Sequence, residues 1–251
     1  MTHTRMRLLR YTVLSASLLG LALRALLYAT AIDYKGLLAA GHWATWSILI
    51  LSGLVLAALL FMTRKVQTPD AYTDCFPASV IRSFGSLAAA LVIGARSFSH
   101  YCTAGDLLEL AAAVSGMVAG IGLLLVAICR LMGRKPSFLC HSALSIFFAL
   151  QLISQYRRWS ADPQLMDYCF YLIALICLMI TGYFMAGFEA EMRSPRALLF
   201  FSMAATFFCL LALPESGDAP MLIACALWAF TCSPPDANQD PHLKNKGLTA
   251  K

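Results

Sequence analysis

The sequence predicts an all-α protein, a polytopic transmembrane helix bundle of about eight spans with both termini on the cytoplasmic side. Of the 251 residues, 60% are hydrophobic and only 13% are charged, whereas an average soluble domain is about 45–50% apolar and about 25% charged. The apolar residues are gathered in long runs, and a bilayer core requires about 20 apolar residues per helix. Basic residues flank these runs, which is typical of membrane anchoring and not of a nucleic-acid-binding patch.

Eight apolar segments separated by polar turns define the predicted spans. They cover about 8–32, 42–62, 79–98, 106–129, 137–156, 165–188, 196–213 and 219–232. Residues 1–233 therefore form the predicted membrane domain. Residues 234–251 contain Pro, Asn and Lys and are expected to be a disordered cytoplasmic tail.

Local signals justify these elements in chain order. The first span has the Arg-rich start of a secretory signal, but Arg24 interrupts its apolar core, so we interpret it as an uncleaved span. Asp162-Pro163 is typical of a helix N-cap followed by proline at the first helical position. The last span is the shortest, because about 14 residues rise only about 21 Å as a helix. A re-entrant segment is the alternative there.

The distribution of basic residues predicts the orientation. With the N-terminus inside, about fourteen Lys and Arg residues fall on the cytoplasmic side and about four on the outer side. This asymmetry follows the positive-inside rule. The expected location is the plasma membrane, as a multi-pass protein.

Polar side chains gather at the predicted outer ends of the spans, and they form the candidate ligand-binding site. Such groups at membrane depth either hydrogen-bond another helix or line a cavity. Gln151, Gln155 and Arg158 are spaced to share one helical face. Arg24 lies inside the first span, and Glu109 is its candidate partner, with Arg96 competing for that carboxylate. The predicted site residues are Arg24, Arg96, Glu109, Gln151, Gln155, Arg157, Arg158, Asp162 and Asp167.

Motifs for catalysis or cofactor binding do not appear in the sequence, so we predict no catalytic residue, no metal and no cofactor. Glu189, Glu191 and Arg193 faintly resemble the Glu-and-Arg motif of CAAX-processing-type membrane proteases. Since no span-embedded histidines accompany them, we interpret them as a solvated helix terminus. The nine cysteines are expected to be small buried hydrophobes. Only Cys102 and Cys169 fall near outer helix ends, where a disulfide is a hypothesis.

The segment from Tyr156 to Pro163, followed by Asp167-Tyr168 and Phe170, is similar to a signature of multi-pass membrane proteins of Gram-positive-type bacteria whose activity is uncharacterised. The resemblance covers about a tenth of the chain directly. It implies a plasma-membrane location and transfers no catalytic residue.

Three functional hypotheses remain open from the sequence. The leading one is a non-enzymatic protein that binds a small polar solute or a lipid head group at its outer face, as a transport or sensory component. The second is a structural or assembly subunit of a membrane complex with a protein partner. The third and least favoured is an intramembrane enzyme, which requires a catalytic constellation converging in one cavity.

Overall fold

The computed structural model describes residues 2–31, 42–64, 72–76, 78–159, 169–192, 194–214 and 217–233. All regular structure in these ranges is helical, which confirms the predicted all-α class. The helices are α1 (Thr2–Ala31), α2 (Trp43–Thr63), α3 (Tyr72–Cys75), α4 (Val80–Thr103), α5 (Leu107–Leu131), α6 (Phe138–Trp159), α7 (Cys169–Glu189), α8 (Pro195–Leu211) and α9 (Ala219–Thr231).

Six of these helices, α1, α2, α4, α5, α6 and α7, are long and apolar enough to cross a membrane. The chain therefore has the construction of a multi-pass membrane protein. Helices α8 and α9 are apolar but shorter, and their side chains are largely buried inside the bundle. A helix surrounded by protein does not have to match the lipid thickness along its full length.

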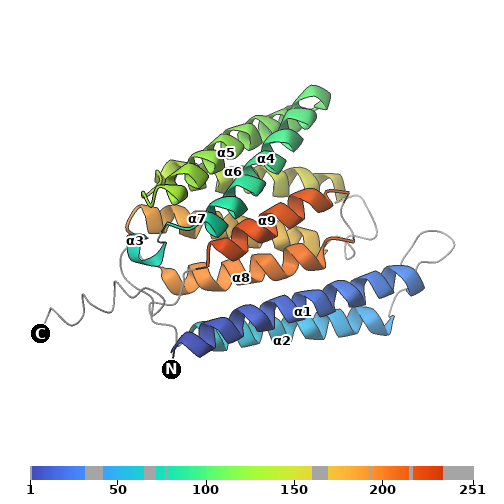
Figure 1. The fold of residues 1–251 in the computed structure, drawn as a ribbon. Coiled ribbons are helices and arrows are strands. Elements are labelled where there is room, and N and C mark those ends of the chain that lie inside the picture. The colour runs from blue at the N-terminus through green and yellow to red at the C-terminus, as the bar shows by residue number, and fades with distance from the viewer. Residues whose placement is uncertain are drawn as a thin grey trace, which may run out of the picture.

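Helices α4 to α9 close a ring (Figure 1). Each packs on the next in chain order, and α9 packs back on α4. The α1–α2 hairpin lies outside this ring and packs on α8. Ring contacts of Trp228 on α9 with Phe148 and His141 on α6 fill the interior. The ring is thus a packed core and not an open lumen.

Helices α4 and α5 approach each other closely. A Cβ atom added at Gly120 would lie 3.2 Å from the carbonyl oxygen of Ala90 and 3.2 Å from the Cα of Gly94. Gly116, one turn earlier, faces Ser97 of α4 and Phe147 of α6. The Ser83 hydroxyl also donates to the Ala127 carbonyl at 2.7 Å. Small residues and serine hydroxyls are the groups that bring membrane helices together, because lipid offers no hydrophobic driving force between them.

The two ends of the ring differ in chemistry. One end holds the start of α4 and the ends of α5, α7 and α9, and Arg82 and Arg130 lie there. We call it the basic end. We call the opposite end the pocket end, since the cavity described below opens there.

Two helices finish at the basic end in a Schellman arrangement. Gly133 after α5 and Glu191 after α7 both have φ of 66°. The amide of Met192 donates to the Gly187 carbonyl at 2.8 Å, and that of Arg134 to the Cys129 carbonyl at 2.9 Å. A positive φ suits glycine but is unfavourable for glutamate. The turn after α7 is therefore held by its surroundings and not by its own sequence.

The short helix α3 was not predicted. The sequence indicates only a polar loop between the second and third spans. Cys75 and Phe76 are nonetheless 0% and 4% exposed. The Phe76 ring lies under the guanidinium groups of Arg82 and Arg130, at 5.4 and 5.8 Å. This segment therefore closes the basic end of the ring instead of lying free in solvent.

We predict that Gly116→Ala destabilises the bundle, whereas Gly53→Ala does not. Both changes raise helix propensity by about 1 kcal/mol. The new Cβ at position 116 would lie 2.1 Å from Ser97 Oγ and 2.7 Å from the Phe147 ring, whereas nothing lies within 4 Å at position 53. Overpacking of this kind costs about 1–3 kcal/mol. Thermal unfolding of the two purified variants measures the difference, and equal midpoints would contradict the α4–α5 packing.

Candidate functional site

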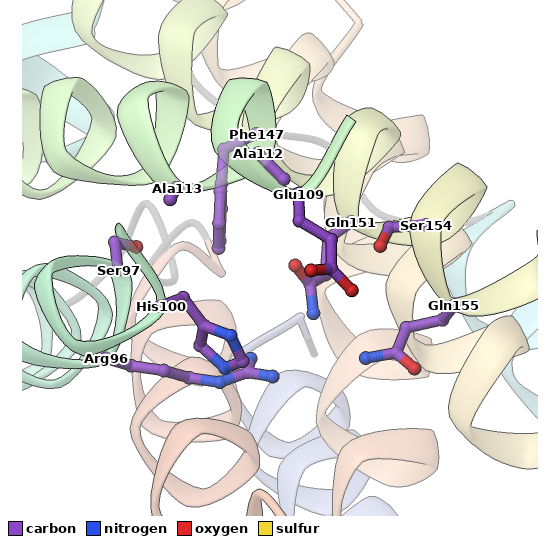
Figure 2. A pocket seen from close by; sticks show the side chains of 10 residues that line it. All are labelled: Arg96, Ser97, His100, Glu109, Ala112, Ala113, Phe147, Gln151, Ser154 and Gln155. Atoms are coloured by element: carbon purple, nitrogen blue, oxygen red, sulfur yellow. The ribbon is translucent and has the colours of Figure 1, made fainter. Parts of the chain in front are cut away.

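A pocket at the pocket end lies between α4, α5 and α6 (Figure 2). Its side chains come from the last turns of α4, the first turns of α5 and the second half of α6. The lining residues are Arg96, Ser97, His100, Glu109, Ala112, Ala113, Phe147, Gln151, Ser154 and Gln155. Four predicted site residues, Arg96, Glu109, Gln151 and Gln155, are therefore brought together by the fold.

Local structure places these groups. Asp106 is the N-cap of α5, and its carboxylate accepts from the Leu107 amide at 2.8 Å. This starts α5 so that Glu109 falls in its first turn, where a carboxylate also stabilises the positive end of the helix dipole. Gln151 and Gln155 are one turn apart on α6 and face the same side. Figure 2 shows the Glu109 carboxylate and both amides directed into the pocket, with Arg96 and His100 on the opposite side.

Arg96 joins the pocket to α9. One Nη atom makes an ion pair with Asp218, which precedes α9, and the other contacts the Met221 sulfur. The buried hydroxyl of Tyr171 on α7 lies beside Arg96 and Gln151. The sequence gives no signal that pairs Asp218 with Arg96, because 122 residues separate them.

The pocket is small and polar. The empty volume of the pocket, including its open mouth, is about 400 Å³. Only about 30 Å³ of this volume is accessible to the centre of a water-sized sphere. One ordered water requires about 10–15 Å³ by the second measure. In this conformation the pocket has room for about two waters, or for one ionised group of similar size such as an ammonium or a carboxylate.

Arg157 lies at the rim of the pocket. Its Nη1 is 2.7 Å from Asp106 Oδ2, and both side chains are largely exposed. A shallower hollow lined by Asp106, Leu108, Glu109, Ser154 and Arg157 continues the pocket outward. The side chain of Arg158, and Asp162 and Asp167 entirely, lie outside the described part of the chain, so their predicted roles stay predictions.

Arg24 does not join this pocket. It is 2% exposed, and its guanidinium carbon lies 4.9 Å from the Phe170 ring and 5.4 Å from the Tyr28 ring. Helix α1 packs on α2 and α8, whereas α5 lies on the far side of the ring (Figure 1). The predicted pair of Arg24 with Glu109 is therefore wrong. The error arises because depth in the membrane was known from the sequence but the order of helices around the bundle was not.

Glu189 is a second correction. The sequence indicates a solvated helix terminus, but the Glu189 side chain is 0% exposed, and its Oε1 lies 2.8 Å from Nδ1 of the equally buried His141. The exposed residue of the segment is Glu191, which pairs with Lys135 at 2.9 Å. The buried Glu189 and the exposed Glu191 are only two residues apart. Hydropathy cannot distinguish two positions that are so close in the sequence.

None of the nine cysteines, all of which lie in the described ranges, forms a disulfide with another described residue. The hypothesis of a disulfide between Cys102 and Cys169 is thus not supported, since Cys102 is exposed and unbridged. Within the described ranges, no group of three or more His, Cys, Asp or Glu side chains is arranged to hold a metal ion.

We predict that the Arg96–Asp218 pair couples α4 to α9 more strongly than the rim pair couples α5 to α6. A double-mutant cycle of Arg96→Gln and Asp218→Asn should give a coupling free energy of about 1–3 kcal/mol, because the pair is charged and largely shielded from water. The matched cycle of Arg157→Gln and Asp106→Asn should give about 0.2–1 kcal/mol, because that pair is exposed. Unfolding midpoints of the purified variants measure both. A weaker coupling at Arg96 than at Arg157 would contradict the assignment.

Comparison with known proteins gives no family to which the chain can be assigned. No protein-family model matches it, and no curated protein or solved structure is significantly similar. The resemblance of the segment from Tyr156 to Phe170 stays an expectation. The functional argument therefore depends on the geometry of the pocket.

Proposed function

We propose that the chain is an eight-span protein of a bacterial plasma membrane that binds a small polar solute or a lipid head group in its outer pocket, as a transport or sensory component. The observation that carries the proposal is the convergence of Arg96, Glu109, Gln151 and Gln155 from three helices on one small cavity. Ionised and amide groups are costly to place near lipid, so such a concentration favours a binding role.

The pocket chemistry favours a ligand with at least one ionised group. A carboxylate with neighbouring amide and hydroxyl oxygens suits an ammonium group, whereas a guanidinium suits a carboxylate or a phosphate. Glu109 and Arg96 provide both kinds in one cavity. A zwitterion, whether a free solute or the head group of a phospholipid, matches this set. Because the enclosed space is small, only a charged group of such a ligand can enter it fully.

The proposed orientation places the basic end in the cytoplasm. Arg10, Arg64, Arg82, Arg130 and Lys135 are on helices or turns at that end. The pocket end then faces outward, at the depth of the outer head groups. A lipid in the outer leaflet or a solute outside the cell thus has direct access to the hollow between Asp106 and Arg157.

The alternative function is a structural or assembly subunit. The ion pairs of Arg96 with Asp218 and of Arg157 with Asp106 favour it, since each ties two helices of the same chain together. Purification of the protein with a stoichiometric partner would support this alternative. Retention of ligand binding by the isolated chain would support the first.

We predict that zwitterionic probes stabilise the protein through the pocket. The probes are O-phosphoethanolamine as a free head group, glycine as a small zwitterion, and nanodiscs of phosphatidylethanolamine compared with phosphatidylglycerol. Glu109→Gln and Gln151→Leu should each weaken binding about 10- to 100-fold, because a hydrogen bond to a charged group contributes about 1.5–3 kcal/mol. Calorimetric titration and thermal unfolding with each probe provide the measurement.

Glu191→Gln is the matched control for this experiment. It makes the same chemical change at the exposed Glu191 on the opposite end of the bundle, and should leave binding unchanged. Stabilisation by free probes indicates a solute site, and stabilisation only in phosphatidylethanolamine discs indicates a lipid site. Equal binding by all variants, or no effect of any probe, would reject the pocket as the site.

We predict that α9 crosses the membrane as the eighth span. A topology reporter fused after Gly217 should report the outer side, and one fused after Lys251 should report the cytoplasm. A fusion after Arg134, at the basic end, is the internal reference for the cytoplasmic side. Identical signals from the Gly217 and Lys251 fusions would show that α9 does not cross, and would leave an odd number of spans.

A further inference from the structure

A second cluster of ionisable side chains lies at the basic end, far from the outer pocket. Its centre is the pair of His141 on α6 and Glu189 on α7, with Nδ1 and Oε1 2.8 Å apart and both side chains 0% exposed. Burying a charge without a partner is expensive, so ionisable groups this deep in a bundle are rare and typically functional. The role argued below for this pair is separate from the proposed function of the outer pocket.

Charged and titratable side chains from several helices lie around the pair. Arg130 is 3% exposed, and its guanidinium donates to Ser86 Oγ at 2.7 Å and contacts Cys232 Sγ at 3.5 Å. It lies within electrostatic reach of Glu189. The remaining titratable neighbours are Tyr72 on α3, Arg82 on α4, Cys140 on α6 and Cys232 on α9.

These neighbours fix all charges of the cluster except one. Arg82 and Arg130 keep their positive charge in a protein, and the Glu189 carboxylate lies within electrostatic reach of Arg130. Cysteine and tyrosine side chains are neutral near pH 7. Among these residue types, histidine is the one whose side-chain charge ordinarily changes between about pH 5 and 8. The buried carboxylate beside it is positioned to compensate the additional positive charge.

The pair also has unused hydrogen-bonding capacity. Nε2 of His141 and Oε2 of Glu189 are buried without a hydrogen-bond partner. The distance between Nδ1 and Oε1 is that of a hydrogen bond. The two groups are not aligned for one, however, and neither atom has another hydrogen-bond partner. Buried polar groups are almost always satisfied in native proteins. Nε2 of His141 is therefore a position at which a proton can be added without breaking an existing hydrogen bond.

The route to solvent is short. Glu189 is the last residue of α7, and Ala190 and Glu191 directly after it are exposed. The turn between them is the one held at a positive φ at Glu191. A proton therefore reaches the pair from the basic end and does not have to cross the packed interior.

From this arrangement we propose that the His141–Glu189 pair is a proton-binding site, which takes up one proton from the basic end to form an imidazolium–carboxylate pair. The proton adds to an imidazole nitrogen, no covalent bond other than N–H changes, and the carboxylate balances the charge. Trp228 on α9 lies against the His141 ring, with centroids 6.0 Å apart and planes at 28°. The protonation state is thus sensed directly by a side chain of another helix.

Fluorescence of Trp228 tests the proposal in the full-length protein. Trp43, Trp46 and Trp159 are replaced by phenylalanine, so that Trp228 is the remaining emitter, and the protein is titrated in nanodiscs. An imidazolium quenches a neighbouring indole more strongly than neutral imidazole does. We expect one reversible transition with lower emission on the acid side, and its loss in His141→Gln.

Glu189→Gln provides the second variant, which keeps His141 in place. Removing the carboxylate disfavours the imidazolium, so the midpoint should move to lower pH. Glu191→Gln and His100→Gln are the controls, and both should retain the wild-type midpoint, since one changes an exposed carboxylate nearby and the other a histidine at the pocket end. A transition that persists in His141→Gln, an unmoved midpoint in Glu189→Gln, or no transition in the parent protein would each overturn the proposal.

Discussion

Polar side chains inside a bilayer have to be satisfied by the protein itself, because hydrocarbon supplies neither water nor hydrogen-bond partners. The ring of α4 to α9 depends on this constraint at each level. Serine hydroxyls reach the carbonyls of the next helix, as Ser83 does to Ala127 and Ser145 does to Met179. Buried arginines are placed against rings, hydroxyls and thiols. The helices that provide these partners are thereby fixed in their order around the ring.

Helix α9 is the element through which both ends of the ring are connected. Asp218 before its first turn holds Arg96, and Cys232 after its last turn contacts Arg130. Its middle is nearly pure packing surface, with Cys225 and Trp228 at most 1% exposed. A short helix held at each end by a charged side chain has its rotation and its depth set by those contacts.

The sequence predicts the helices and part of the pocket well, for a physical reason. Apolar runs and their basic flanks are local features, and they determine which segments are helical and which residues share a depth. Arg96, Glu109, Gln151 and Gln155 converge because all four lie at the same depth on neighbouring helices. Partners depend instead on how each helix is rotated and which helix lies beside it. For this reason Asp218 beside Arg96, Glu189 beside His141 and the separation of Arg24 from Glu109 could not be predicted.

A continuous series of ring contacts joins the pocket to the basic end. Phe147 lines the pocket and contacts Phe148, Phe148 contacts Trp228, and Trp228 contacts His141, with centroids 5.3, 6.4 and 6.0 Å apart. These side chains are buried, so within the described part of the chain they form a continuous packed layer. Contact alone does not couple two sites, since coupling requires an element with two arrangements that both sites bias. Helix α9 contacts both places, because Asp218 directly before it pairs with Arg96 and Trp228 on it contacts the His141 ring.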